Sequence, residues 1–117
     1  MEKIYSLIAV AVVLFTANIA RAEYRPPIHG NLNIADVGAT DRVELPALRV
    51  QSCTIQAFSG NAGAVYVGGV DVTNASGAKR GIRLAPGEPF NSIDVQDASW
   101  LYVAADNAGD DVTYFCN

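Results

Sequence analysis

Residues 53–57 have the sequence Cys-Thr-Ile-Gln-Ala, in which small or apolar side chains alternate with polar ones. Because successive side chains of a β-strand point to opposite faces of a sheet, this alternation predicts a strand with one buried face. The last residues of the chain repeat the pattern, since residues 112–116 have the sequence Val-Thr-Tyr-Phe-Cys. Each segment therefore places a cysteine, Cys53 or Cys116, on the side predicted to face a core.

The rest of the chain shows further short strands and no helical periodicity after residue 22. Turn signals recur roughly every eight to twelve residues, a spacing typical of β-sandwiches. We expect an all-β domain over residues 42–117, a small β-sandwich of jelly-roll or immunoglobulin-like type with about six to eight short antiparallel strands. A small barrel is the alternative. Two of the predicted strands are interrupted: Pro46 separates residues 43–45 from 48–50, and Gly68-Gly69 separates residues 64–67 from 70–72. The other predicted strands are residues 53–57, 82–84, 90–95, 100–105 and 112–116.

Two local features refine these strands. The apolar phase shifts by one residue between Val50 and Cys53, which predicts a bulge or a bend there. Pro86-Gly87 predicts a type II turn, because proline suits its first central position and glycine supplies the positive φ of the second.

Residues 23–41 are predicted to form an extended N-terminal arm. Pro26-Pro27 is incompatible with a helix interior. Leu32 and Ile34 are spaced so that they would share one face of a strand, and Val37 follows as a further apolar residue. Two interpretations stay open: the arm adds one edge strand to the sandwich, or it reaches a neighbouring subunit.

Residues 1–22 have the organisation of a secretory signal peptide, with a lysine near the start, an apolar run and the ending Ala-Arg-Ala. Cleavage is expected between Ala22 and Glu23. The alternative is an uncleaved membrane anchor formed by residues 4–20, at the lower edge of the ~17–25 residues that span a bilayer. Cleavage is the favoured interpretation, and it predicts an exported domain, in the periplasm, outside the cell or in a virion.

Cys53 and Cys116 are the only cysteines of the chain. Because an even pair usually forms a disulfide in an oxidising compartment, we expect this bridge. It would close a loop of about sixty residues and stabilise the domain by ~4 kcal/mol on the chain-entropy model. Redox or metal chemistry is not expected of the pair, since no Cys-x-x-Cys spacing occurs and the chain has one histidine.

The charge of the exported domain narrows the choice of partners. Beyond residue 22, six basic and eleven acidic residues leave a net charge of −5. Nucleic-acid binding depends on neutralising phosphates, so this composition argues against it. The one basic cluster, within residues 79–83, is predicted to be a solvated turn. The expected partners are other protein subunits, with a homo-oligomer as one form.

No combination of residues suggests catalysis, and we expect neither enzymatic activity nor a cofactor. His29, the single histidine, is expected to be a surface residue of the arm. Asp94 and Asp97 flank a predicted turn, where a two-carboxylate hydrolase is the less favoured interpretation. Residues 106–111 place acidic and amide side chains around a glycine, as a calcium loop does, but they lack the spacing of an EF-hand. We expect a plain turn without metal.

Trp100 and Tyr102 fall on one face of the predicted strand 100–105 and form the candidate binding surface. If that face is exposed, their rings would suit stacking against a carbohydrate. If it is buried, they cover the second face of the sandwich. Asn74-Ala75-Ser76 matches a glycosylation sequon, which matters only if the source is eukaryotic.

Three phrases follow one another in a recognisable order: Thr-Ile-Gln-Ala at 54–57, Val-Tyr-Val-Gly-Gly at 65–69 and Leu-Ala-Pro-Gly-Glu at 84–88. With the phrases around them, they extend over most of residues 45–117. This order resembles small β-rich structural proteins of bacteriophages and prophages. The further matching phrases are residues 45–47, 70–72, 81–83, 93–95, 100–104 and 109–114.

The resemblance implies a virion component, a minor structural, decoration or fibre-associated protein that binds other proteins and has no catalytic motif. The leader adds a constraint, because proteins of tailed phages ordinarily assemble in the cytoplasm without signal peptide or disulfide. We therefore expect either a coat or spike protein of a phage that assembles at the host envelope, or a related domain used by a bacterium. The alternative function is a periplasmic or secreted binding domain, with glycans as one class of ligand.

Overall fold

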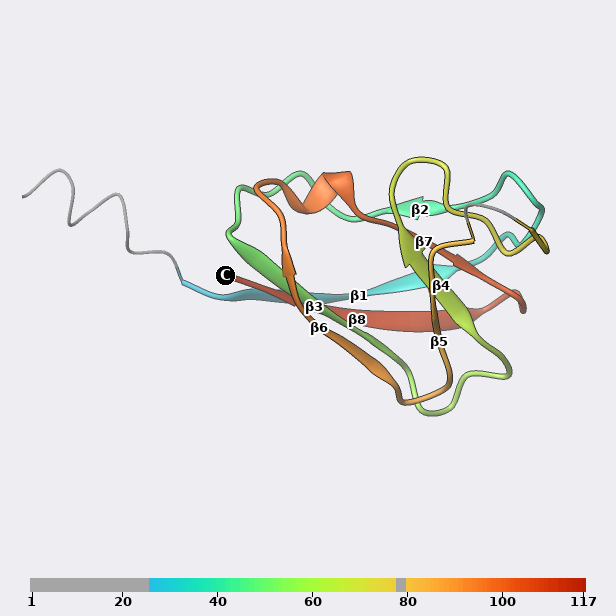
Figure 1. Ribbon diagram of the computed structural model, residues 1–117. Coiled ribbons are helices and arrows are strands. Elements are labelled where there is room, and N and C mark those ends of the chain that lie inside the picture. The colour runs from blue at the N-terminus through green and yellow to red at the C-terminus, as the bar shows by residue number, and fades with distance from the viewer. Residues whose placement is uncertain (1–25, 78–79) are drawn as a thin grey trace, which may run out of the picture.

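The computed structural model of the protein describes residues 26–77 and 80–117 (Figure 1). The predicted signal peptide, its cleavage site between Ala22 and Glu23, and the alternative anchor at residues 4–20 lie outside the described residues. Within the described part of the chain, no helix is long and apolar enough to cross a bilayer.

Within residues 26–77 and 80–117, eight strands form two four-stranded antiparallel sheets, in the orders β1-β8-β3-β6 and β2-β7-β4-β5. We call these sheet A and sheet B. One short 3₁₀ turn, η1, lies between β6 and β7. The elements are β1 Ile28–Ile34, β2 Val43–Glu44, β3 Ser52–Ala57, β4 Val65–Gly68, β5 Ile82–Leu84, β6 Pro89–Asp94, η1 Ala98–Trp100, β7 Tyr102–Ala105 and β8 Asp110–Cys116.

The strand pairing identifies the sandwich as a jelly roll. β1 pairs with β8, β2 with β7, β3 with β6 and β4 with β5, all antiparallel. The first half of the chain thus lies alongside the second half in reverse order, as when one long antiparallel ribbon is rolled up into two facing sheets. Eight strands in this arrangement define the jelly roll. The expected all-β sandwich is confirmed, and its topology is the jelly-roll one and not the immunoglobulin-like one.

The core lies between the two sheets and is built from the inward faces of the alternating strands. β8 shows the alternation most regularly, because Asp110, Val112, Tyr114 and Cys116 are buried while Thr113 and Phe115 are exposed. The main core cluster consists of Ile34, Leu45, Val50, Cys53, Ile55, Ala57, Val65, Val67, Leu84, Ala98, Leu101, Val103, Ala105, Val112, Tyr114 and Cys116.

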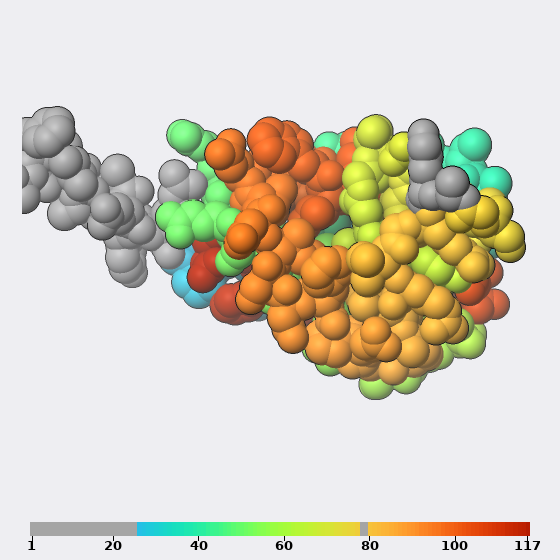
Figure 2. Space-filling view, in the orientation of Figure 1, coloured from blue at the N-terminus to red at the C-terminus, as the bar shows by residue number. Residues whose placement is uncertain are grey.

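Part of the predicted arm belongs to the sandwich. Residues Ile28–Ile34 form β1, which pairs with β8 over all seven residues, so the edge-strand interpretation describes this segment. The sandwich therefore begins at Ile28, before the predicted boundary at residue 42. Ile28 lies opposite Cys116, and the start of β1 and the C-terminal residues emerge together at one end of the molecule (Figure 2).

Three predicted strands need correction. Residues 70–72 belong to a turn closed by the Val72 N–H and the Gly69 carbonyl (3.0 Å), because the two preceding glycines end β4. Residues 48–50 contribute one isolated bridge, from Arg49 to Asp97. In the predicted strand 100–105, Trp100 belongs to η1 and β7 begins at Tyr102.

The local predictions are confirmed in part. A bend occurs at Gln51, where the apolar phase shifts. Pro86-Gly87 forms the type II turn: Gly87 has φ +84°, and the Glu88 N–H donates to the Ala85 carbonyl (2.9 Å).

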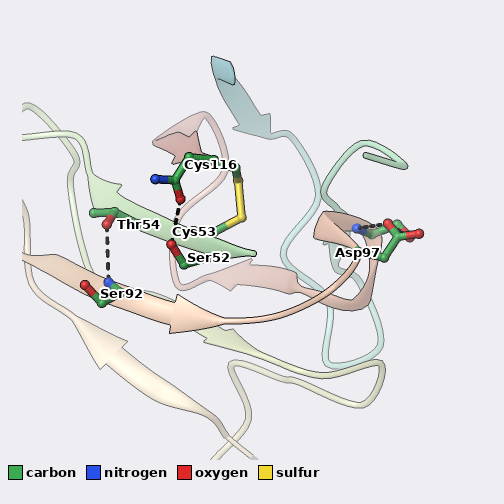
Figure 3. Close-up of a disulfide and its surroundings, with 8 residues drawn as sticks. Ser52, Cys53, Thr54, Ser92, Asp97 and Cys116 are labelled. Carbon is green, nitrogen blue, oxygen red and sulfur yellow. Dashed lines mark hydrogen bonds between the residues drawn. A yellow bond between two sulfur atoms is a disulfide. The ribbon is translucent and has the colours of Figure 1, made fainter. Parts of the chain in front are cut away.

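A β-bulge that was not predicted lies in β6. Cys53 pairs with Ile93 and Ile55 with Phe90, so two residues of β6 oppose the single Thr54. One of the two is Ser92, which has φ +55° and donates its N–H to the Thr54 hydroxyl at 3.3 Å (Figure 3).

Candidate functional site

The candidate site lies where two connections run side by side, the one from β2 to β3 and the one from β6 to β7. The Val50 N–H donates to the Gln96 carbonyl (3.0 Å), and the Val95 N–H donates to the Gln51 carbonyl (3.2 Å). These bonds continue the pairing of β3 with β6 beyond the ends of both strands. Two segments far apart in the sequence are thereby held together without being regular strands.

Asp97 shapes the second of these connections. Its carboxylate accepts hydrogen bonds from the backbone N–H (2.9 Å) and the hydroxyl (2.7 Å) of Ser99. These bonds cap η1 and turn the chain before Trp100, which explains why Trp100 does not continue into β7. They also hold the pKa of Asp97 below its usual value of 3.8, because both donors stabilise the ionised carboxylate.

A hollow of about 430 Å³ lies on this surface and opens to solvent. Trp100 lines it, and its side chain is 57 % exposed. The side chains of Arg49, Gln51, Gln96 and Trp100 have no hydrogen-bond or ion-pair partner among the described residues. The residues around the hollow are Arg49, Val50, Gln51, Gln96, Asp97 and Trp100.

The chemistry of this hollow is that of a polar recognition site. An indole offers an apolar plate and one N–H donor, and two glutamines each offer both donors and an acceptor. A guanidinium adds a fixed positive charge that suits carboxylate or hydroxyl oxygens. The arrangement can bind a small polar ligand. Asp97 is the one carboxylate among its lining residues, and its hydrogen bonds to Ser99 cap η1.

Tyr102, the other half of the predicted binding surface, is placed differently. It packs partly buried against a small second cluster on the outer face of sheet B, formed by Ala64, Tyr66, Val72 and Ala104. Trp100 lines the hollow and Tyr102 covers this cluster, so the two rings have separate surroundings.

Tyr66 is the centre of the second cluster. Its ring is covered by the Arg80 guanidinium, 4.8 Å from the ring centroid, and its hydroxyl donates to the Asp106 carboxylate (3.0 Å). Burial is the main cause of a raised pKa of Tyr66, and the Asp106 carboxylate adds to it, while Arg80 and Arg83 oppose it. The cluster fastens the loop after β4 onto sheet B and is structural.

The acidic turn at residues 106–111 has a structural explanation for each of its aspartates. Asp106 accepts from Tyr66. The buried Asp110 accepts from the backbone N–H groups of Ala62 (2.9 Å) and Gly63 (3.1 Å). Asp111 accepts from the Asn33 amide (2.8 Å). The three carboxylates face different partners, and within the described ranges no group of three metal-ligating side chains occurs.

Other candidate residues lie apart from the hollow or have partners of their own. His29 is exposed on β1, opposite Phe115. Asp94, the other half of the carboxylate pair, is exposed at the end of β6. The Asn74 amide of the sequon donates to two backbone carbonyls, those of Val37 and Ala105, both at 2.7 Å. A glycan on that nitrogen would displace these bonds.

Cys53 and Cys116 form the expected disulfide, and both are buried (Figure 3). They lie directly opposite each other on β3 and β8, with Cα atoms 4.1 Å apart. The bridge therefore joins two neighbouring central strands of sheet A at the end where the chain terminates. Disulfides of this kind are typical of proteins from oxidising compartments.

The sequence identified Trp100 and Asp97 but missed Arg49, Gln51 and Gln96 as neighbours. These three residues lie on two connections. Neither the phase shift between Val50 and Cys53 nor the turn predicted between Asp94 and Asp97 indicated that the two connections lie side by side. The available signal was a valine with polar neighbours in each connection, at residues 49–51 and 95–97.

Comparison of the chain with models of protein families, with curated proteins and with solved structures finds no match. The jelly-roll pairing, the disulfide and the hollow at Trp100 are therefore the observations on which an account of function rests.

Proposed function

We propose that the protein is a non-enzymatic structural or attachment-associated component of a phage or prophage particle, exported and closed by its disulfide. The observation that carries the proposal is the jelly-roll pairing of all eight strands within one small domain. This architecture occurs in viral capsid proteins and in lectins, whose work is done by surfaces. Because one fold hosts many functions, the order of phage-like phrases in residues 45–117 is needed as independent support.

The disulfide supports the exported form of this role. A buried bridge between central strands would be protected in an oxidising compartment, which a particle assembled at the host envelope passes through. The polar, turn-rich loops of the sandwich offer contact surfaces without any catalytic set. A role in protein–protein contact requires only such surfaces, and the described residues provide them.

The test is mass spectrometry of purified particles from the source strain, after induction of any prophage and separation on a density gradient. We expect tryptic peptides of the chain to co-purify with capsid proteins in a fixed ratio, and the first residue of the mature form to be Glu23. Particles that contain the capsid proteins but no peptide of this chain would contradict the proposal.

A second candidate function, an exported glycan-binding domain, is favoured by the hollow at Trp100. A half-exposed indole beside unpaired amide and guanidinium donors is suited to a pyranose, whose C–H face stacks on an aromatic ring while its hydroxyls take hydrogen bonds. Here the ligand would lie across η1 and the two connections.

The glycan candidate is tested by Trp100→Ala against the matched control Phe115→Ala, which removes another exposed aromatic ring outside the hollow. Binding is measured by calorimetry with neutral and with carboxylated oligosaccharides. We expect binding that Trp100→Ala weakens at least about tenfold and the control leaves unchanged, both variants melting within a few degrees of the native protein. No binding by the native protein, or equal loss in both variants, would rule this function out.

A further inference from the structure

The four edges of the two sheets differ in how well they are protected against pairing with another chain. Unpaired backbone groups on an edge strand are a template for a further strand, and proteins block them with short strands, charges, prolines or bulges. Sheet B ends in β2 and β5, which have two and three residues. In sheet A, β6 begins at Pro89, carries the bulge at Ser92 and ends at Asp94.

β1, the fourth edge, has none of these devices. It is seven residues long, Ile-His-Gly-Asn-Leu-Asn-Ile, with no proline and no acidic, lysine or arginine side chain. Its register with β8 runs without interruption from Ile28 to Ile34. A domain with a net charge of −5 therefore presents one long, regular and uncharged strand at the edge of sheet A.

The ladder shows which backbone groups of β1 are free. Asn117 and Ser52 exchange two backbone hydrogen bonds (3.0 and 3.2 Å), so the backbone N–H and C=O groups of Asn117 point toward β3. Since the direction of the N–H and C=O groups alternates along a strand, the backbone N–H and C=O groups of Cys116 point away from β3, toward Ile28 of β1. The backbone of every second residue of β1, namely His29, Asn31 and Asn33, then points away from β8. All three residues are exposed.

We propose that β1 pairs antiparallel with β1 of a second copy of this chain, which joins two A sheets into one continuous eight-stranded sheet across a two-fold axis. The axis passes beside Asn31, so that Asn31 faces its own copy and His29 faces Asn33. All three outward residues then exchange both of their backbone hydrogen bonds.

The side chains support a second copy as the occupant. On the inner face Gly30 comes opposite Leu32, a small residue against a large one, and Ile28 comes opposite Ile34. On the outer face amides and the imidazole meet without like charges, which a two-fold contact between acidic domains requires. This inference deepens the proposed function, on which it rests, because it names the contact through which the structural subunit would assemble.

The experiment uses the protein exported from a bacterial host with its own N-terminal residues, and measures its mass by sedimentation equilibrium over a range of concentrations. Asn31→Lys places two like charges opposite each other on the axis, and Asn31→Pro removes an outward N–H while the backbone bonds to β8 stay in place. Both variants also lose the exposed bond that the Thr113 hydroxyl of β8 donates to the Asn31 side chain (3.0 Å), so their melting temperatures are measured alongside. Gln56→Lys is the control, because Gln56 is exposed on the interior strand β3 and the charge change is the same.

We expect a dimer for the native protein and for Gln56→Lys, with amide hydrogen exchange slowed at His29, Asn31 and Asn33. Both Asn31 variants should dimerise at least about tenfold more weakly while melting close to the native temperature. A native protein that stays monomeric, a dimer that both Asn31 variants retain, or equal loss in the control would overturn the inference. None of these results touches the presence of the chain in particles, which has its own test.

Discussion

Breaking the bond between Cys53 and Cys116 is the perturbation whose size the structure predicts most directly. The cleanest comparison is between the native disulfide form and the same chain with both thiols free. No atom other than two hydrogens is added, and the two cysteines stay buried in the core of sheet A. The double variant Cys53→Ala, Cys116→Ala serves as a second, permanently unbridged form.

The magnitude follows from the sequence separation of the two cysteines, which is 63. On the chain-entropy model, a loop of that length makes the unfolded state less favourable by about 4 kcal/mol when it is closed. Small domains have net stabilities of about 5–15 kcal/mol, so this bond supplies a large share of the total. For a domain of this size the loss should lower Tm by roughly 15–30 °C.

The assay is thermal unfolding followed by circular dichroism at 218 nm. Because the bridge is buried, the thiol form is prepared by reduction in denaturant and refolding under reductant, and its two free thiols are counted by mass spectrometry after alkylation. Urea titration of both forms gives the difference in free energy of unfolding. The alanine double variant should melt at or below the temperature of the thiol form.

The reasoning is refuted if the thiol form, with both thiols confirmed, loses less than about 1 kcal/mol. Such a result would mean that the unfolded chain is already constrained near these residues. A loss in the alanine variant alone would assign the effect to packing of the sulfur atoms and not to loop closure.

Three further predictions concern single residues. Ser92→Gly should raise the free energy of unfolding by up to about 1 kcal/mol in urea titration, because glycine accepts φ +55° freely, whereas Ser92→Val should lower it. Asp110→Asn should cost about 1.5–3 kcal/mol by the same measurement, since the N–H groups of Ala62 and Gly63 lose a charged acceptor. The pKa of Tyr66 is raised above 10.0 in the folded state, so the stability it contributes is complete below about pH 10 and is lost as the pH rises through the folded pKa. Absorbance at 295 nm should show this late titration, and Tyr66→Phe should flatten the alkaline loss of stability.

Local alternation was sufficient to predict most strands, because the period of two is a property of neighbouring residues. It also placed Cys53 and Cys116 on the inward faces of their strands, where the disulfide is found. The choice between jelly-roll and immunoglobulin-like pairing was not accessible in this way. It depends on which distant strands meet, such as β1 with β8, and no short segment carries that information.

The errors have local physical causes. Trp100 fits the alternation of residues 100–105, but the Asp97 carboxylate bonds to Ser99 and turns the chain first. Pro26-Pro27 suggested an extended arm, but the residues that follow, Ile28–Ile34, form β1 and pair with β8 along their whole length. The hollow was missed because Arg49 and Gln96 come together only through pairing between two irregular connections.

The disulfide and the pairing of Ile28 with Cys116 also determine how the molecule unfolds under a mechanical load. A pull between the two ends of the described chain separates antiparallel neighbours from their shared end, so the bonds between β1 and β8 break one after another. β8 cannot peel from β3 in turn, because Cys116 is tied covalently to Cys53. The first event under load is thus the unzipping of β1. The load then passes through the disulfide, so the loop that it closes, from Cys53 through β4, β5, β6 and β7 to Cys116, carries no tension.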